Sequence, residues 1–80
     1  MDAKTVEAMV REALVDATVS VEGAGANYDI TVVSDAFADM RAVRRQQTVY
    51  AAINQAIASG SIHAVNIRAL TPAEWESEGA

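Results

Sequence analysis

The 80-residue sequence contains no cysteine and only one histidine. Without cysteine, the chain forms no disulfide, offers no thiol nucleophile and cannot hold zinc or an iron–sulfur cluster through thiolates of its own. A single histidine also excludes a metal site built from several histidines of this chain. Stability must therefore come from the packing of one small core, because the chain has neither a disulfide crosslink nor a metal site of these kinds to support it.

Long apolar segments are also missing. The longest uncharged segment, residues 46–67, is interrupted by glutamine, asparagine, serine and histidine and is too polar to span a bilayer. The first residues lack the basic start and apolar run of a signal peptide. We therefore expect a soluble, cytoplasmic protein with a single domain over residues 1–80.

The chain has few basic residues, and they are unevenly placed. The formal net charge is −5, yet residues 40–70 carry four arginines and no acidic residue. The acidic total is a poor match to a nonspecific nucleic-acid binder, which must neutralise phosphates. The locally basic middle third nevertheless leaves a small patch for an anionic partner.

The side-chain sets of common enzymes are absent too. The sequence has no phosphate-binding loop of the Walker type, no nucleophile with a neighbouring base and no pattern of paired carboxylates. Asp35 and Asp39 flank Phe37 at a predicted helix start, where capping and the helix dipole account for them. The chain is therefore not expected to be an enzyme.

Two helices are predicted from apolar residues at spacings of three and four. The first covers residues 3–16, with Asp2 as its N-cap. The second covers residues 37–58, begins with a short turn and ends before Gly60, a suitable cap residue. The predicted core-facing residues of this second helix are Met40, Val43, Tyr50, Ile53 and Ile57.

Alternating polar and apolar residues predict strands over residues 18–22, 28–32 and 62–70. Gly23 and Gly25 indicate a hairpin loop of about five residues between the first two strands. The helix before the third strand implies a crossover and hence a parallel pair. Residues 71–74, TPAE, form a capping box for a one-turn helix.

These elements predict an α+β fold with the order α-β-β-α-β. The fold is a three-stranded mixed sheet with its helices packed on one face. Trp75, on the terminal turn, is assigned a structural role. An exposed strand edge also leaves a homodimer open.

Two segments resemble the signature of the BolA family. The first comprises residues 33–41, VSDAFADMR, followed by residues 44–50, RRQQTVY. The second comprises residues 62–67, IHAVNI, running into TPAEW. The QQTVY version is most similar to the short bacterial IbaG-like branch of the family, and the resemblance extends from about Val6 to Trp75.

This resemblance implies a type II KH-like fold and a monothiol glutaredoxin as the main partner in a heterodimer. Such pairs share a bridging [2Fe–2S] cluster with glutathione, in iron–sulfur cluster assembly or trafficking and in iron or stress regulation. The chain would hold no cofactor on its own. Some family members are also associated with transcription regulation through DNA binding.

His63 matches the family's C-terminal cluster ligand. Imidazole is a suitable iron ligand, and histidine in place of thiolate raises the reduction potential of a cluster. The alternative from the residues alone is an ordinary histidine at a strand end. The second family ligand, a histidine or cysteine in the hairpin loop, corresponds to Asn27, whose neutral amide is a poor iron–sulfur ligand. Weak cluster sharing, another completing ligand, or a cluster-free heterodimer all remain open.

Arg41, Arg44 and Arg45, with Thr48, are predicted to share one face of the second helix. Guanidinium groups pair well with carboxylates, so this face is a candidate contact for glutaredoxin or glutathione. As an alternative, it is a candidate recognition helix on DNA phosphates. A solvated helix face with no partner is the third interpretation.

Overall fold

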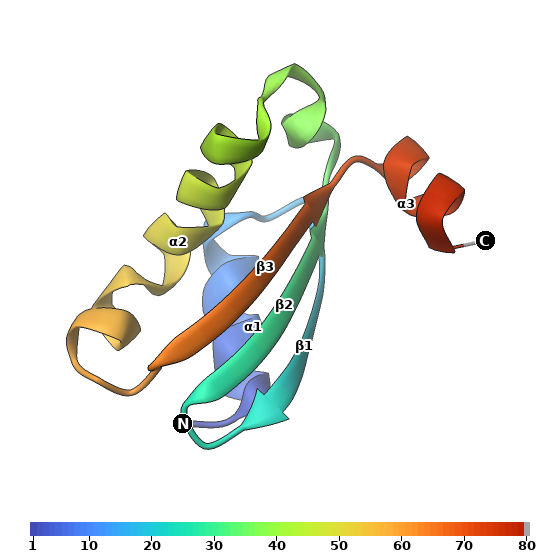
Figure 1. The fold of residues 1–80 in the computed structure, drawn as a ribbon. Coiled ribbons are helices and arrows are strands. Elements are labelled where there is room, and N and C mark those ends of the chain that lie inside the picture. The colour runs from blue at the N-terminus through green and yellow to red at the C-terminus, as the bar shows by residue number, and fades with distance from the viewer. Residues whose placement is uncertain (80) are drawn as a thin grey trace.

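The computed structural model describes residues 1–79 and shows one mixed sheet with helices around it (Figure 1). The strands are β1 (Thr18–Ala24), β2 (Asn27–Val33) and β3 (Ala64–Leu70). The helices are α1 (Ala3–Ala13), the 3₁₀ helix η1 (Asp35–Asp39), α2 (Ala42–Ala58) and α3 (Pro72–Gly79). Across residues 1–79, each helix is either too short or too polar to cross a bilayer.

The strand order is β1-β2-β3, with β1 antiparallel and β3 parallel to the central strand. The predicted mixed sheet and the crossover through α2 are therefore confirmed. The long helices α1 and α2 cover one face of the sheet (Figure 1). The prediction that all helices lie on that face is wrong for α3, which sits over one end of the other face beside Thr18 and Thr31.

The core lies between the sheet and the two long helices. Alternation along β2 buries Tyr28, Ile30 and Val32, as predicted, whereas Asn27 and Asp29, on either side of Tyr28, are exposed. Phe37 of η1 is fully buried and closes one end of this layer. The other buried apolar residues are Val6, Val10, Val19, Val49, Ile53, Ala56, Ile62 and Ala69.

The predicted core face of the second helix is wrong at two of its five residues, whereas the other three are buried or pack against the core. Val49, Ile53 and Ala56 are buried, whereas Val43 is 69% exposed and Tyr50 is 41% exposed. The α2 surface that meets the core contains small alanines, which give little signal in a hydrophobic pattern. The larger Val43 and Tyr50 shifted the predicted stripe toward the flank of the helix.

Several element boundaries also differ from the predictions. The first helix ends at Ala13, since the chain must leave it to begin β1 at Thr18. The third strand begins at Ala64, because Ser61 and Ile62 donate their N–H groups to the Ala56 carbonyl at the end of α2. The terminal helix spans eight residues rather than one turn.

The local caps are confirmed. The Asp2 carboxylate accepts hydrogen bonds from the backbone N–H and the hydroxyl of Thr5, at 2.9 and 2.7 Å. These bonds, led by the hydroxyl, lower the pKa of Asp2 below its usual value. Thr71 and Glu74 form the predicted reciprocal capping box.

The hairpin between β1 and β2 is tighter than predicted. Gly23 and Ala24 remain in the strand ladder, so only Gly25 and Ala26 form the loop. Gly25 has φ +66°, which suits a two-residue hairpin turn, and its missing side chain faces open space. Gly23 has φ +129°, and a Cβ there would collide with the Asn27 carbonyl.

These two glycines predict a matched pair of effects on stability. In Gly25→Ala the new Cβ faces open space, so the only penalty is the left-handed backbone conformation. This variant should lower the free energy of unfolding by about 1 kcal/mol. In Gly23→Ala the new Cβ would also collide with the backbone carbonyl of Asn27. This variant should lower the free energy of unfolding by about 3 kcal/mol or more. Urea unfolding followed by circular dichroism measures both, and equal losses for the two variants would contradict this account of the hairpin.

Candidate functional site

His63 lies at the end of the sheet where the hairpin turns and β3 begins (Figure 1). Its backbone N–H donates to the Ala26 carbonyl at 2.8 Å, and the next N–H, of Ala64, donates to the same oxygen at 3.1 Å. The side chain is exposed, and its Nε2 lies 3.9 Å from the point where a Cβ on Gly60 would stand. The backbone of His63 is thus held by the hairpin while its ring reaches solvent beside the end of α2.

Asn27 is close to His63 in the backbone but faces elsewhere. Its register partner on β3 is Ala64, the residue after His63. The neighbouring Tyr28 is buried against the helices, so alternation directs Asn27 to the opposite, uncovered face of the sheet. The two candidate ligand positions therefore share one end of the molecule without converging on one point.

Arg41 and Arg44 lie at the opposite end of α2. Both are exposed and line a shallow groove with Ala36, Asp39 and Val43. The rise of α2 is about 1.5 Å per residue, which places Arg44 about 21 Å from the helix end beside His63. The predicted arginine contact and the predicted cluster ligand are therefore two separate sites.

Arg45 does not share that exposed surface, because its side chain is only 15% exposed. Its Nη1 and Nη2 donate to the Glu74 carboxylate at 2.6 and 3.3 Å, and its Nε donates to the Met40 carbonyl at 3.0 Å. The guanidinium also donates to the Ala69 carbonyl at 3.2 Å and lies 6.0 Å from the Phe37 ring centre. These contacts occupy the donors that were predicted to face a partner.

Thr48 is also engaged within the protein. Its hydroxyl donates to the Arg44 carbonyl at 2.8 Å in the preceding turn of α2, and the residue is only partly exposed. Of the four residues predicted to share this face, Arg41 and Arg44 are left with side chains directed to solvent.

The sequence placed Glu74 in a capping box but did not indicate its pairing with Arg45, and it did not indicate the contact that Gln46 makes. Gln46 donates its amide to the Ile67 carbonyl at 2.8 Å, two residues before the Ala69 carbonyl that Arg45 binds. These are outward-facing carbonyls of the edge strand β3, so α2 covers part of that edge. The charge of Glu74, opposite an acid-free segment, was the one available signal for its pairing.

Within residues 1–79, the chain offers one suitable ligand, the His63 imidazole, to a shared cluster. Within residues 1–79, no three His, Asp or Glu side chains are grouped to hold a metal ion. The exposed imidazole of His63 is chemically suited to iron, whereas the amide of Asn27 is not and faces away. The donor set therefore fits a cluster whose remaining ligands come from a partner, and it does not fit a self-contained site.

The sequence and the fold both match known proteins. A family model for BolA-like proteins matches residues 5–74. The chain is a member of the BolA family. Its backbone superposes on a BolA protein homologue from Coxiella burnetii with a TM-score of 0.84, at 27% identity, over 95% of this chain and 97% of that one.

Curated relatives carry two kinds of name. The acid stress protein IbaG of Escherichia coli K12 is 39% identical over 75 residues, covering 94% of this BolA-family chain and 89% of the relative. The DNA-binding transcriptional regulator BolA of Haemophilus influenzae is 32% identical over 59 residues, covering 74% of this chain and 56% of the relative. The similarity to the IbaG branch is thus confirmed.

The pair between Arg45 and Glu74 predicts a pH-dependent contribution to stability. The hydrogen bonds from Arg45, followed by that from the Thr71 N–H, hold the pKa of Glu74 below its usual 4.5. The stabilisation is therefore present above about pH 4.5 and is lost as the pH falls through the lower pKa of the folded state.

Glu74→Gln should accordingly be less stable than the native protein at pH 7, and the difference should shrink as the pH falls below about 4.5. Thermal unfolding at a series of pH values measures this difference. Glu12→Gln, an exposed change of the same charge on α1, is the matched control. A stability difference that stays constant over this pH range would refute the role of the Glu74 charge.

Proposed function

We propose that this BolA-family protein is a cytoplasmic, non-enzymatic adaptor that binds a monothiol glutaredoxin. In this role it shares a [2Fe–2S] cluster with the partner and glutathione, in iron–sulfur cluster trafficking and in iron or stress regulation. The observation that carries the proposal is the exposed ring of His63. Its backbone is fixed because the N–H groups of His63 and Ala64 both donate to the Ala26 carbonyl. Membership of the family supports the same assignment.

The position of His63 suits a ligand that is offered to a second protein. A ligand must be accessible from outside, and the ring is exposed at the end of the molecule rather than inside the core. It must also be held in place, and the bifurcated hydrogen bond ties His63 and Ala64 to the hairpin. The backbone that carries the imidazole is therefore fixed relative to the hairpin.

The composition requires the partner to complete the site. The chain has one histidine and no cysteine, so it can supply one nitrogen and no thiolate. The partner and glutathione would contribute thiolates, and the cluster would then sit at the interface. Asn27 and the hairpin lie beside this position and belong to the proposed contact surface, with Asn27 as a contact and not as a ligand.

His63 and Asn27 provide a matched pair of variants. After anaerobic reconstitution with a monothiol glutaredoxin, glutathione and iron, the native heterodimer should absorb in the visible. His63→Ala should lose most of that absorption, because it removes the only nitrogen ligand. Asn27→Ala should retain the cluster, because its amide faces the other side of the sheet.

Size exclusion and circular dichroism complete this experiment. A coloured one-to-one heterodimer that is lost only in His63→Ala supports the proposal. If the native protein formed a colourless heterodimer, the result would support glutaredoxin as the partner and refute the shared cluster. Retention of the native spectrum by His63→Ala would refute the ligand, and the absence of any heterodimer would refute the adaptor function.

A second candidate function is DNA binding by the exposed arginines at the start of α2. The name of the Haemophilus influenzae relative supports it, together with the exposure of Arg41 and Arg44. The type II KH-like grouping implied by the resemblance adds no support to this candidate, because the sequence lacks the Gly-x-x-Gly loop with which KH domains clamp nucleic acid. Arg45 and Thr48 contribute little to it, since their donors are bound within the protein.

Gel shift across a range of salt concentrations tests this candidate. If Arg41 and Arg44 contact phosphates, the double alanine variant should weaken binding and reduce the slope of log K against log salt by about two. Arg11→Ala, an exposed arginine on α1, is the control and should leave the slope unchanged. No retardation of native protein at low salt would exclude this function.

A further inference from the structure

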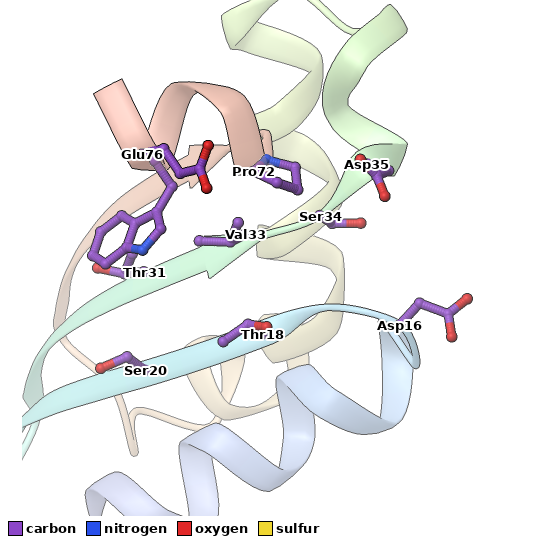
Figure 2. Close-up of a pocket in the computed structure, with 10 residues that line it drawn as sticks. Asp16, Thr18, Ser20, Thr31, Val33, Ser34, Asp35, Pro72 and Glu76 are labelled. Carbon is purple, nitrogen blue, oxygen red and sulfur yellow. The ribbon is translucent and has the colours of Figure 1, made fainter. Parts of the chain in front are cut away.

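The sheet face opposite the long helices contains a groove, here called the Trp75 groove (Figure 2). Its floor is formed by outward-facing residues of β1 and β2, namely Thr18, Ser20, Thr31 and Val33. Pro72 and Trp75 of α3 form one wall. The volume is about 350 Å³, within the range that small-molecule sites occupy.

Trp75 is not part of the hydrophobic core. It is the only tryptophan of the chain and remains 43% exposed, although the sequence had suggested a purely structural role. An accessible indole beside Val33 and Pro72 offers an apolar surface with a π face. The hydroxyls of Thr18, Ser20 and Thr31 make no hydrogen bond to residues 1–79, so they are free to accept from a ligand.

The electrostatics of the groove select a cation. Three carboxylates, Asp16, Asp35 and Glu76, line it, and no lysine or arginine does. Across residues 1–79 the ion pairs involve other acids, so these three are not neutralised by a neighbouring base. Ammonium groups bind both carboxylates and the face of an indole ring, and they donate to hydroxyl oxygens as well.

The arrangement of the carboxylates further defines the ligand. Figure 2 shows Asp16 and Asp35 at one end of the groove and Glu76 at the other, with Val33 between them. A matching ligand therefore carries positive charge at both ends and an apolar chain in the middle. We propose that the Trp75 groove binds a linear aliphatic polyamine, with its methylenes against Trp75 and Val33 and its ammonium groups at the two acidic ends.

The fluorescence of Trp75 provides a direct test, because no other tryptophan contributes to the signal. Titration of the isolated protein with spermidine at low ionic strength should give a saturable change in emission. The double variant Asp16→Asn/Glu76→Gln should weaken binding by about tenfold or more, since it removes a charge at each end of the groove. Glu7→Gln/Glu12→Gln carries the same charge change on α1, on the other side of the sheet from the groove, and should bind as the native protein does.

Butylamine and Mg²⁺ at matched ionic strength separate this site from general ionic attraction. Both should bind clearly more weakly than spermidine, since neither spans the two acidic ends with an apolar chain. The proposal is overturned by an equal response to Mg²⁺, by equal weakening in the control variant, or by no saturable response to spermidine. Saturation by a tetra-arginine peptide but not by spermidine would instead assign the groove to a basic protein segment. The titration needs no glutaredoxin, so its outcome is independent of the proposed adaptor function.

Discussion

The ion pair between Arg45 and Glu74 is the interaction on which the arrangement of the outer elements depends. The guanidinium joins the end of η1, the edge of β3 and the capping box of α3 through hydrogen bonds to Met40, Ala69 and Glu74. Because the side chain is largely removed from water, its donors need partners inside the protein. Segments far apart in the sequence are thereby held at one corner of the sheet.

This corner also determines which surfaces stay open. Arg45 and Gln46 bind two outward carbonyls of β3, so part of that strand edge is closed to pairing with another chain. The pairing of Arg45 with Glu74 also holds the start of α3 against α2. One wall of the Trp75 groove therefore exists because Glu74, the neighbour of Trp75, is bound by an arginine of α2.

Three candidate binding surfaces lie apart on the molecule. The His63 end lies where the hairpin meets β3, the exposed arginines lie at the start of α2, and the groove lies on the uncovered sheet face. The length of α2 separates the first two by about 21 Å, so they do not form one continuous site. A shared cluster and an anionic partner therefore need not compete for the same residues.

The sequence by itself determined the order of the elements, the parallel crossover and the caps at Asp2 and Thr71. Each of these follows from residues close together along the chain, where spacing and hydrogen-bonding capacity act directly. The family motif likewise identified His63 as the candidate ligand. Local pattern failed on α2, where small alanines pack against the core and Val43 remains exposed. Only the tertiary structure decided that Arg45 is enclosed, that Asn27 faces away from His63, and that Trp75 lines a groove. Those outcomes depend on contacts between distant segments, which the spacing of residues within one helix or strand does not encode.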